Sequence, residues 1–295
     1  MDLSDTNLNA EATPPVGNTT GSGTIGRLLV DAGKIKAQDV DRVLKLMQEQ
    51  KIRFGEAAIK LGLIKEADVQ KVLAHQFDYA YLTPGQGKFS ADLIAAYQPF
   101  SDQAEALRAL RNQLKLRWLG EDHKALTVTS VSGGEGASFL VANLAVTFAQ
   151  LGVKTLLVDA DMRSPRQHEI FGLGQHLGLS DMLAGRTDQS ALCGVQTFDT
   201  LTVLPAGSPA PNPAELLAGT AFPKLLEKLA GNYEIVLVDT PPAQTALDYQ
   251  IVAARVGGVL MVTRRDHTRL EAAATMKEMV QTAGAEVVGA FVNIF

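Results

Sequence analysis

The sequence predicts an α/β fold in which a small helical domain precedes a doubly wound, mostly parallel sheet. Two observations predict the sheet. From Ser101 onward, short apolar runs rich in Val, Ile and Leu alternate with helical segments, and a glycine-rich loop joins the first of these runs to a helix. A repeat predicts the helical domain, because Ile25-Gly26 and Gly33 recur 29 positions later as Phe54-Gly55 and Gly62.

The composition is typical of a cytoplasmic protein with two domains in its 295 residues. The 27 Lys and Arg against 32 Asp and Glu give a net charge of −5, which argues against a dedicated nucleic-acid binder. No uncharged apolar run approaches the ~18 residues needed to span a bilayer, and the N-terminus lacks a secretory signal. The single cysteine, Cys193, excludes an internal disulfide framework, and we interpret it as a packing residue.

Composition and periodicity predict four segments: a flexible tail (1–22), a helical paired-repeat domain (23–78), a linker (79–100) and an α/β domain (101–295). Each repeat unit predicts a short helix, a glycine-bearing turn and an amphipathic helix that begins near Gln38 or Ala67. The α/β domain opens with a helix over 103–118. Its predicted strands are 125–131, 155–158, 201–204, 235–238, 258–263 and 287–293.

The glycine-rich loop has the spacing of a phosphate-binding loop but lacks its lysine. It runs from Val131 to Ser138, between a strand and a helix, so its backbone N–H groups and the helix dipole converge on one point that suits phosphate. The usual loop ends in Gly-Lys-Ser/Thr, in which the lysine reaches the β- and γ-phosphates and the hydroxyl binds Mg²⁺. Here Ala137 stands between Gly136 and Ser138. The pattern predicts a P-loop NTPase-type domain that keeps the phosphate cradle without the mobile positive charge.

Three carboxylates follow two of the predicted strands. Asp159 and Asp161 come after the apolar run at 155–158, and Asp239 follows the run at 235–238. Ligands of such sheets lie beyond the carboxyl ends of the strands, where the glycine-rich loop also lies. Three acids and the Ser138 hydroxyl suggest Mg²⁺, which prefers oxygen ligands. The alternative is that each aspartate caps the helix that follows its strand.

The region 101–295 resembles the bacterial tyrosine kinases of exopolysaccharide assembly, the BY-kinases. Apart from Ala137, the glycine-rich loop matches their first Walker motif; Leu156 to Arg163 matches their second, and Val236 to Pro242 matches their Walker B motif. Gly178-Leu179-Ser180-Asp181 and Pro205-Ala206-Gly207 are also similar to that family.

The resemblance implies an autokinase that uses ATP and Mg²⁺ and works with a membrane chain-length determinant, so that it lies in the cytoplasm, peripheral to the inner membrane through its partner. It implies that Ser138, Asp159 and Asp239 hold the metal, and that Asp159 and Asp161 orient or deprotonate the acceptor tyrosine. Asn293 would approach the adenine. The resemblance implies contacts with the nucleotide from Gly133, Gly134, Glu135, Gly136, Ala137, Ser138 and Phe139.

A helical segment carries Glu105, Arg108 and Arg111 at a spacing of three, which places them along one face. They match the Glu-x-x-Arg-x-x-Arg segment of the kinases, which resembles a contact between subunits of a homo-oligomer, since arginine forks bind carboxylates of a neighbour. The alternative is a solvated helix with one internal ion pair.

Two departures from the kinase pattern lead to hypotheses. Because Ala137 removes a cation, we hypothesise that Arg163 or Arg166 supplies the missing charge. The kinases usually end in a tyrosine-rich tail, whereas the last residues here are Asn293-Ile294-Phe295. The candidate acceptors are then the tyrosines of the predicted linker region: Tyr79, Tyr81 and Tyr97.

The repeat domain resembles the paired-repeat N-terminal domain of type II secretion ATPases, some of which bind cyclic di-GMP. The stretch from Arg53 to Gln76 fits the second of their two motifs, but Thr24 and Met47 replace the Arg and Gln that bound the first. Loss of an arginine that can bind phosphate at two points favours a protein-docking role, with cyclic di-GMP binding as the alternative.

Three functions compete for the whole chain. The first is a tyrosine autokinase or ATPase of exopolysaccharide chain-length control. The second is a nucleotide-binding scaffold without transfer activity, which Ala137 favours. The third is an ATPase that positions DNA or division proteins, a group that carries a further lysine early in its loop, where this chain has Ser132.

Overall fold

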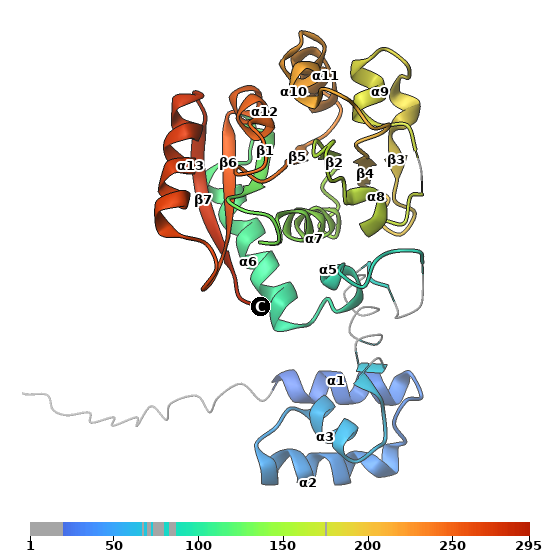
Figure 1. Cartoon of the computed structure of the whole chain (residues 1–295). Helices are drawn as coiled ribbons and strands as arrows, with labels where there is room; N and C mark the ends of the chain where they lie inside the picture. The colour runs from blue at the N-terminus through green and yellow to red at the C-terminus, as the bar shows by residue number, and fades with distance from the viewer. Residues whose placement is uncertain (1–19, 67, 70–71, 73–79, 83–86, 175) are drawn as a thin grey trace, which may run out of the picture. The chain divides into compact units, whose positions relative to one another are not determined.

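The computed structural model describes residues 20–295 except 67, 70–71, 73–79, 83–86 and 175. The chain divides into two compact units, Met1–Phe77 and Asp78–Phe295, each of which is described by itself (Figure 1). Most of the predicted tail lies outside the described residues, but its last residues belong to the first helix, which begins at Thr20. No helix of the described part combines the length and apolar character needed to cross a membrane.

The first unit repeats a helix, a turn and a second helix. It contains α1 (Thr20–Asp31), the short 3-10 helix η1 (Ala37–Asp39), α2 (Val40–Gln50) and α3 (Phe54–Lys60). Gly33 and Gly62 follow α1 and α3 with φ of 66° and 67°, a conformation that favours glycine. Residues 66, 68, 69 and 72 are helical, at positions that η1 and α2 take in the first repeat. The predicted glycine turns are confirmed.

Matching positions of the two repeats form one core. Ile35 and Ile64 are both buried, as are Val43 and Val72, and they pack in the same hydrophobic cluster. Lys34 Nζ lies 2.7 Å from Asp68 Oδ1 and joins the repeats across their polar side. This hydrogen-bonded ammonium lowers the pKa of Asp68. Gln76, which closes the second predicted motif, lies outside the described residues, so the ligand of this unit stays a prediction.

The second unit is built on a seven-stranded sheet in the order β3-β4-β2-β5-β1-β6-β7 (Figure 1). All neighbouring pairs are parallel except β3 with β4. The strands are β1 (Ala125–Ser130), β2 (Thr155–Asp159), β3 (Cys193–Gly194), β4 (Leu201–Leu204), β5 (Ile235–Asp239), β6 (Gly258–Arg264) and β7 (Glu286–Asn293). The predicted fold class is confirmed, together with six of the strands.

Alternate residues of the strands face two separate cores, as expected for a sheet covered on both faces. Leu157 and Leu237 pack with α7 (Ala137–Ala149) and α6 (Asp102–Arg117), whereas Leu156 and Val238 pack on the opposite side. The other helices are α5 (Ile94–Tyr97), α8 (Gln167–Ile170), α9 (Leu179–Leu183), η2 (Gln189–Ala191), α10 (Pro213–Ala218), α11 (Ala221–Ala230), α12 (Asp248–Val256) and α13 (Leu270–Thr282).

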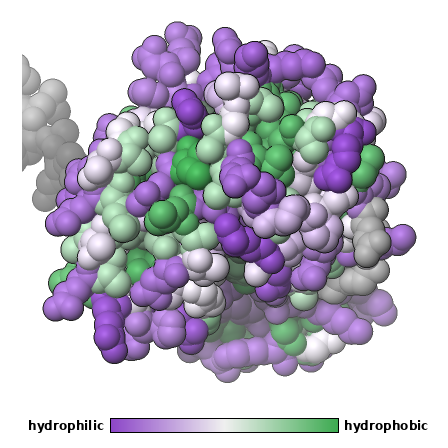
Figure 2. Space-filling view, turned by 45° about the horizontal axis from the view of Figure 1, so that its top comes forward, coloured by the Kyte–Doolittle hydropathy of each residue, from purple (hydrophilic) through white to green (hydrophobic). Residues whose placement is uncertain are grey.

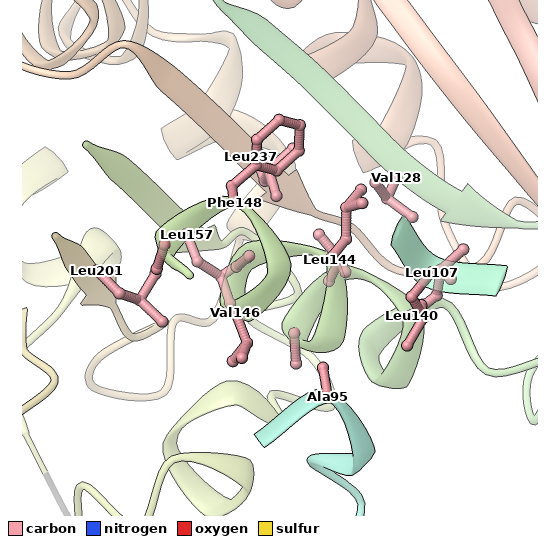
Figure 3. Packing of buried hydrophobic residues seen from close by; sticks show 14 of the residues in the cluster. Ala95, Leu107, Val128, Leu140, Leu144, Val146, Phe148, Leu157, Leu201 and Leu237 are labelled. Atoms are coloured by element: carbon pink, nitrogen blue, oxygen red, sulfur yellow. The ribbon is translucent and has the colours of Figure 1, made fainter. Parts of the chain in front are cut away.

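Helix α7 is buried on almost every side, which fixes the loop before it. In Figure 3, Phe148 of α7 lies near Leu237 of β5, whereas Leu140 lies beside Leu107 of α6.

The face drawn in Figure 2 carries interspersed hydrophilic and hydrophobic residues.

The predicted linker at 79–100 is wrong, because its described residues pack on the sheet unit. Leu93 and Ala96 are fully buried in the core around α7. Asn143 Oδ1 accepts a hydrogen bond from Ala95 N at 2.8 Å. The amide of Gln150 donates to the carbonyls of Ala80 and Ala95, at 3.0 and 2.9 Å. The segment therefore covers α7 and extends the α/β unit at its N-terminal side.

Candidate active site

The phosphate loop lies between β1 and α7 in a conformation that depends on glycine. Gly134 and Gly136 have φ of 76° and 89°, and Gly136 is the N-cap residue immediately before α7. A Cβ on Gly136 would lie 2.5 Å from Asn293 Nδ2. The first turn of α7 directs its amides and the positive end of its dipole toward the loop, which is the arrangement that binds phosphate.

Glu135 anchors this loop from within. Its side chain is fully buried, with Oε2 accepting from Ser132 N at 3.0 Å and Oε1 accepting from Thr268 Oγ1 at 2.5 Å. Asn293 Nδ2 donates to the Glu135 carbonyl at 2.6 Å. The loop is thus tied to the segment after β6 and to the end of β7. Sequence reasoning placed Glu135 in the loop but missed these contacts, and the adenine contact of Asn293 stays a prediction.

Asp159 and Asp239 meet because β2 and β5 pair in register. The two residues are partners across these strands, and both are fully buried. Asp159 accepts backbone hydrogen bonds from Asp161 N, Arg166 N and Gln167 N at 3.0–3.1 Å. Gln167 Nε2 donates to Asp239 Oδ2 at 2.7 Å. The register therefore brings together two of the three predicted acids at the carboxyl edge of the sheet.

Burial and nearby negative charge raise the pKa of both carboxyls. Burial raises the pKa of Asp159 well above its ordinary value, and the negative charge of Asp239 raises it further. Burial also raises the pKa of Asp239 to about 7, while Gln167 and Ser138 oppose that rise because they favour the charged form. A raised pKa at a buried pair of acids is a frequent mark of a functional site.

Asp161, the third predicted acid, lies in the turn after β2. Its Oδ1 accepts from Arg163 N at 3.1 Å and from Ser164 N at 2.9 Å, so it shapes the turn that follows β2. Its side chain is 6% exposed, and burial raises its pKa. Asp161 therefore does not cap a helix, because α8 begins later, at Gln167; the amides of Arg166 and Gln167 at its start donate to Asp159 instead.

The oxygen atoms near the loop fit a hard cation. Asp239 Oδ1 and Gln167 Oε1 are buried acceptors without a hydrogen-bond partner among the described residues. A buried acceptor without a donor costs ~1–3 kcal/mol, so a cation or its water is a favourable neighbour for both. The described residues contain no group of three His, Cys, Asp or Glu side chains arranged around a metal position. Binding of Mg²⁺ by Ser138, Asp159 and Asp239, as one hydroxyl and two carboxylates with water completing the shell, stays a prediction.

The alanine that stands in place of the usual lysine is packed against its neighbours. Ala137 is 7% exposed and belongs to the core around α7. The two hypothesised substitutes are already engaged: Arg163 Nε lies 2.8 Å from Asp248 Oδ2, and Arg166 Nε lies 3.1 Å from Glu169 Oε2. Compensation by either arginine stays a hypothesis, and it requires the guanidinium group to leave its carboxylate.

The predicted oligomer residues divide between the surface and the interior. Arg108 Nη2 lies 2.6 Å from Glu105 Oε2, but only Glu105 is exposed, since the Arg108 side chain is 19% exposed. Arg111 is 5% exposed and donates to the Thr147 carbonyl of α7 at 2.8 Å. The three side chains therefore do not form one exposed face, and a contact between subunits stays a prediction for Glu105 and Arg108.

The candidate acceptor tyrosines belong to the segment that covers α7. Tyr97 is partly buried and its hydroxyl donates to the Phe89 carbonyl at 3.2 Å. Tyr81 is also partly buried, and burial raises the pKa of its hydroxyl. Tyr79 lies outside the described residues. Their role as acceptors stays a prediction.

Asp239→Asn is expected to stabilise the ligand-free protein at pH 8. Because the folded-state pKa is raised from 3.8 to about 7, ionised Asp239 destabilises the fold increasingly as the pH rises through that window, and fully above it. The free energy of unfolding should rise by ~1 kcal/mol at pH 8, or roughly 2–4 °C in Tm, with a smaller gain at pH 5. Thermal melts at the two pH values check this, and a larger gain at pH 5 would contradict it.

Known proteins resemble the second unit over most of its length. Residues 122–295 match the model of the ParA family, described as NUBPL iron-transfer P-loop NTPase. The putative tyrosine-protein kinase CapB of Staphylococcus aureus is 35% identical over 66% of this chain and 86% of its own length. The tyrosine-protein kinase wzc of Salmonella typhi is 34% identical over 69% of this chain, but only 28% of its own length is matched.

A solved structure adds the same relationship in three dimensions. The kinase domain of the Escherichia coli tyrosine kinase ETK is 30% identical, with a TM-score of 0.67 over 71% of this chain and 82% of that domain. The match to the family model spans the phosphate loop, the paired aspartates and the whole sheet. The chain therefore belongs to the bacterial tyrosine kinase family of P-loop NTPases.

Proposed function

We propose that this chain is an ATP-dependent protein-tyrosine autokinase that regulates the chain length and export of an exopolysaccharide. The observation that carries the proposal is the placement of two buried carboxyls, Asp159 and Asp239, beside the first turn of α7. Family membership supports tyrosine as the acceptor.

In the proposed reaction, the loop amides and the α7 dipole hold the phosphates of ATP in place. Mg²⁺, when bound, neutralises phosphate charge. The resemblance to the kinases supports Asp159 or Asp161 as the group that takes the proton from the tyrosine hydroxyl. The phenolic oxygen then forms a bond to the γ-phosphorus, the bond to the β,γ-bridging oxygen breaks, and ADP leaves. Positioning and charge stabilisation supply most of the rate in this class of reaction.

Ala137 favours a second candidate, a scaffold that binds nucleotide without transferring phosphate. One experiment separates the two functions: the purified chain is incubated with γ-labelled ATP and Mg²⁺, and bound nucleotide and phosphotyrosine are both measured. An autokinase gives labelled phosphotyrosine and ADP, whereas a scaffold gives bound nucleotide alone. Absence of any ATP binding would contradict both.

We propose a membrane chain-length determinant as the partner and a homo-oligomer as the working form. The wzc relative supports a partner, because the region that matches this chain is only 28% of that protein's length. Co-purification with candidate membrane proteins tests the partner, and light scattering of the purified chain tests the homo-oligomer. Each measurement is repeated with Glu105→Ala.

A further inference from the structure

Gln167 connects the phosphate loop to the metal-binding carboxyl. It is the first residue of α8 and is fully buried. Its amide nitrogen donates to Asp239 Oδ2 at 2.7 Å and to the Ser138 carbonyl at 3.1 Å. Because both neighbours are acceptors, the NH₂ group must face them, which fixes the orientation of the amide. A single side chain therefore spans the start of α7 and the end of β5.

The same amide leaves two buried acceptors unpaired. Among the described residues, no donor reaches Gln167 Oε1 or Asp239 Oδ1, although the other polar atom of each side chain is hydrogen-bonded. Two buried acceptor oxygens without a donor destabilise the protein when no ligand is bound. They are explained when a cation with its water molecules lies against them.

We infer that Gln167 is a positioning residue that aims Asp239 Oδ1 at the metal and couples metal binding to the phosphate loop. This inference deepens the proposed function and rests on it. Residues that orient a metal ligand commonly change metal affinity by about 10–100-fold when they are removed. A residue that only filled space between α8 and β5 would leave metal affinity unchanged when replaced by an apolar side chain of similar size.

Gln167→Met tests this distinction, because methionine keeps the length of the side chain and removes its polar atoms. The affinity for ADP is measured by calorimetry on the full chain, once with Mg²⁺ and once with EDTA. We expect the gain in affinity due to Mg²⁺ to fall about 10-fold or more. The affinity in EDTA should change less than about 2-fold, because the loop amides remain. Gln189→Met, at an exposed glutamine of η2, is the matched control.

A double-mutant cycle tests whether Gln167 acts through Asp239. In the Asp239→Asn background, the added Gln167→Met should cause no further loss of the Mg²⁺-dependent gain. Additive losses would overturn the inference, as would an unchanged gain in Gln167→Met alone. Those outcomes leave the proposed function standing, since the parent chain still binds Mg–ADP. A parent chain that gains nothing from Mg²⁺ would overturn both.

Gln167→Met removes a donor from a buried carboxyl, so its folding is checked by thermal melting in the same buffers. If the variant is unfolded, Gln167→Glu replaces it in the calorimetry, because the carboxylate keeps the size but cannot donate to Asp239. The inference requires that this variant also loses the Mg²⁺-dependent gain or changes it at least several-fold. An unchanged gain in a folded Gln167→Glu would overturn it.

Discussion

Ala137→Lys is expected to raise phosphoryl transfer from ATP to tyrosine by about 10²–10³-fold, or ~3–4 kcal/mol of transition-state stabilisation. The main-chain cradle and both paired carboxyls are in place, but no cation extends from the start of α7. Charge builds on the transferring phosphoryl group in the transition state, so an ammonium at this position acts where it is most effective. Labelled phosphotyrosine formed per minute by the purified protein is the measurement.

Ala137→Met is the matched control, since it adds a side chain of similar length without charge. We expect no gain in transfer from it. The lysine variant should melt at a lower temperature without nucleotide, because Ala137 is 7% exposed and the new ammonium replaces a packed methyl group. Equal transfer rates for the two variants would show that the site does not use a cation here.

Gly178→Ala is expected to lower the free energy of unfolding by about 3 kcal/mol, near the upper end for overpacking. A Cβ at this position would overlap the Pro205 carbonyl oxygen and the Gly207 amide nitrogen, both of which are backbone atoms that cannot turn aside. The two segments are joined closely there, since Leu179 N donates to the Pro205 carbonyl at 2.8 Å. Asp181 Oδ2 also accepts from Gly178 N at 3.0 Å and would lose that contact.

Urea denaturation measures the loss, and Gly194→Ala is the control. Gly194 lies in β3, where an added Cβ meets nothing within 4 Å. The control should unfold near the parent midpoint, whereas Gly178→Ala should unfold at a clearly lower urea concentration. Coinciding midpoints would mean that the segments before α9 and after β4 can separate without loss of stability.

The sheet was predictable because its strands are buried on both faces and show as continuous apolar runs. β2 and β5 match their predicted spans with one added residue, and in each that residue is the acid at the end of the strand. β3 was missed because Cys193–Gly194 is too short to leave a pattern, and its pairing depends on β4. The positions of Asp159 and Asp239 followed from topology, since parallel strands end at a common edge.

The packing of residues 79–100 and the hydrogen bonds of Gln167 and Glu135 were not predictable from the sequence. Ala95 and Ala96 look unremarkable in sequence, and only the fit against α7 makes them core residues. Gln167 and Glu135 carry no periodic signal, because their partners lie far away along the chain. Such polar contacts are set by the assembled fold, whereas apolar periodicity is local.

The hydrogen bond between Asn293 and the Glu135 carbonyl makes the phosphate loop depend on the edge of the sheet. Because Asn293 at the end of an outermost strand bonds to the Glu135 carbonyl, the nucleotide cradle takes its shape partly from the rim of the sheet. Outer strands separate from a sheet more readily than central ones, since they have a neighbour on only one side. If β7 separated from the sheet, the phosphate loop would therefore lose its contact with Asn293 while the central strands stayed paired. Nucleotide binding would then be lost before the protein unfolds.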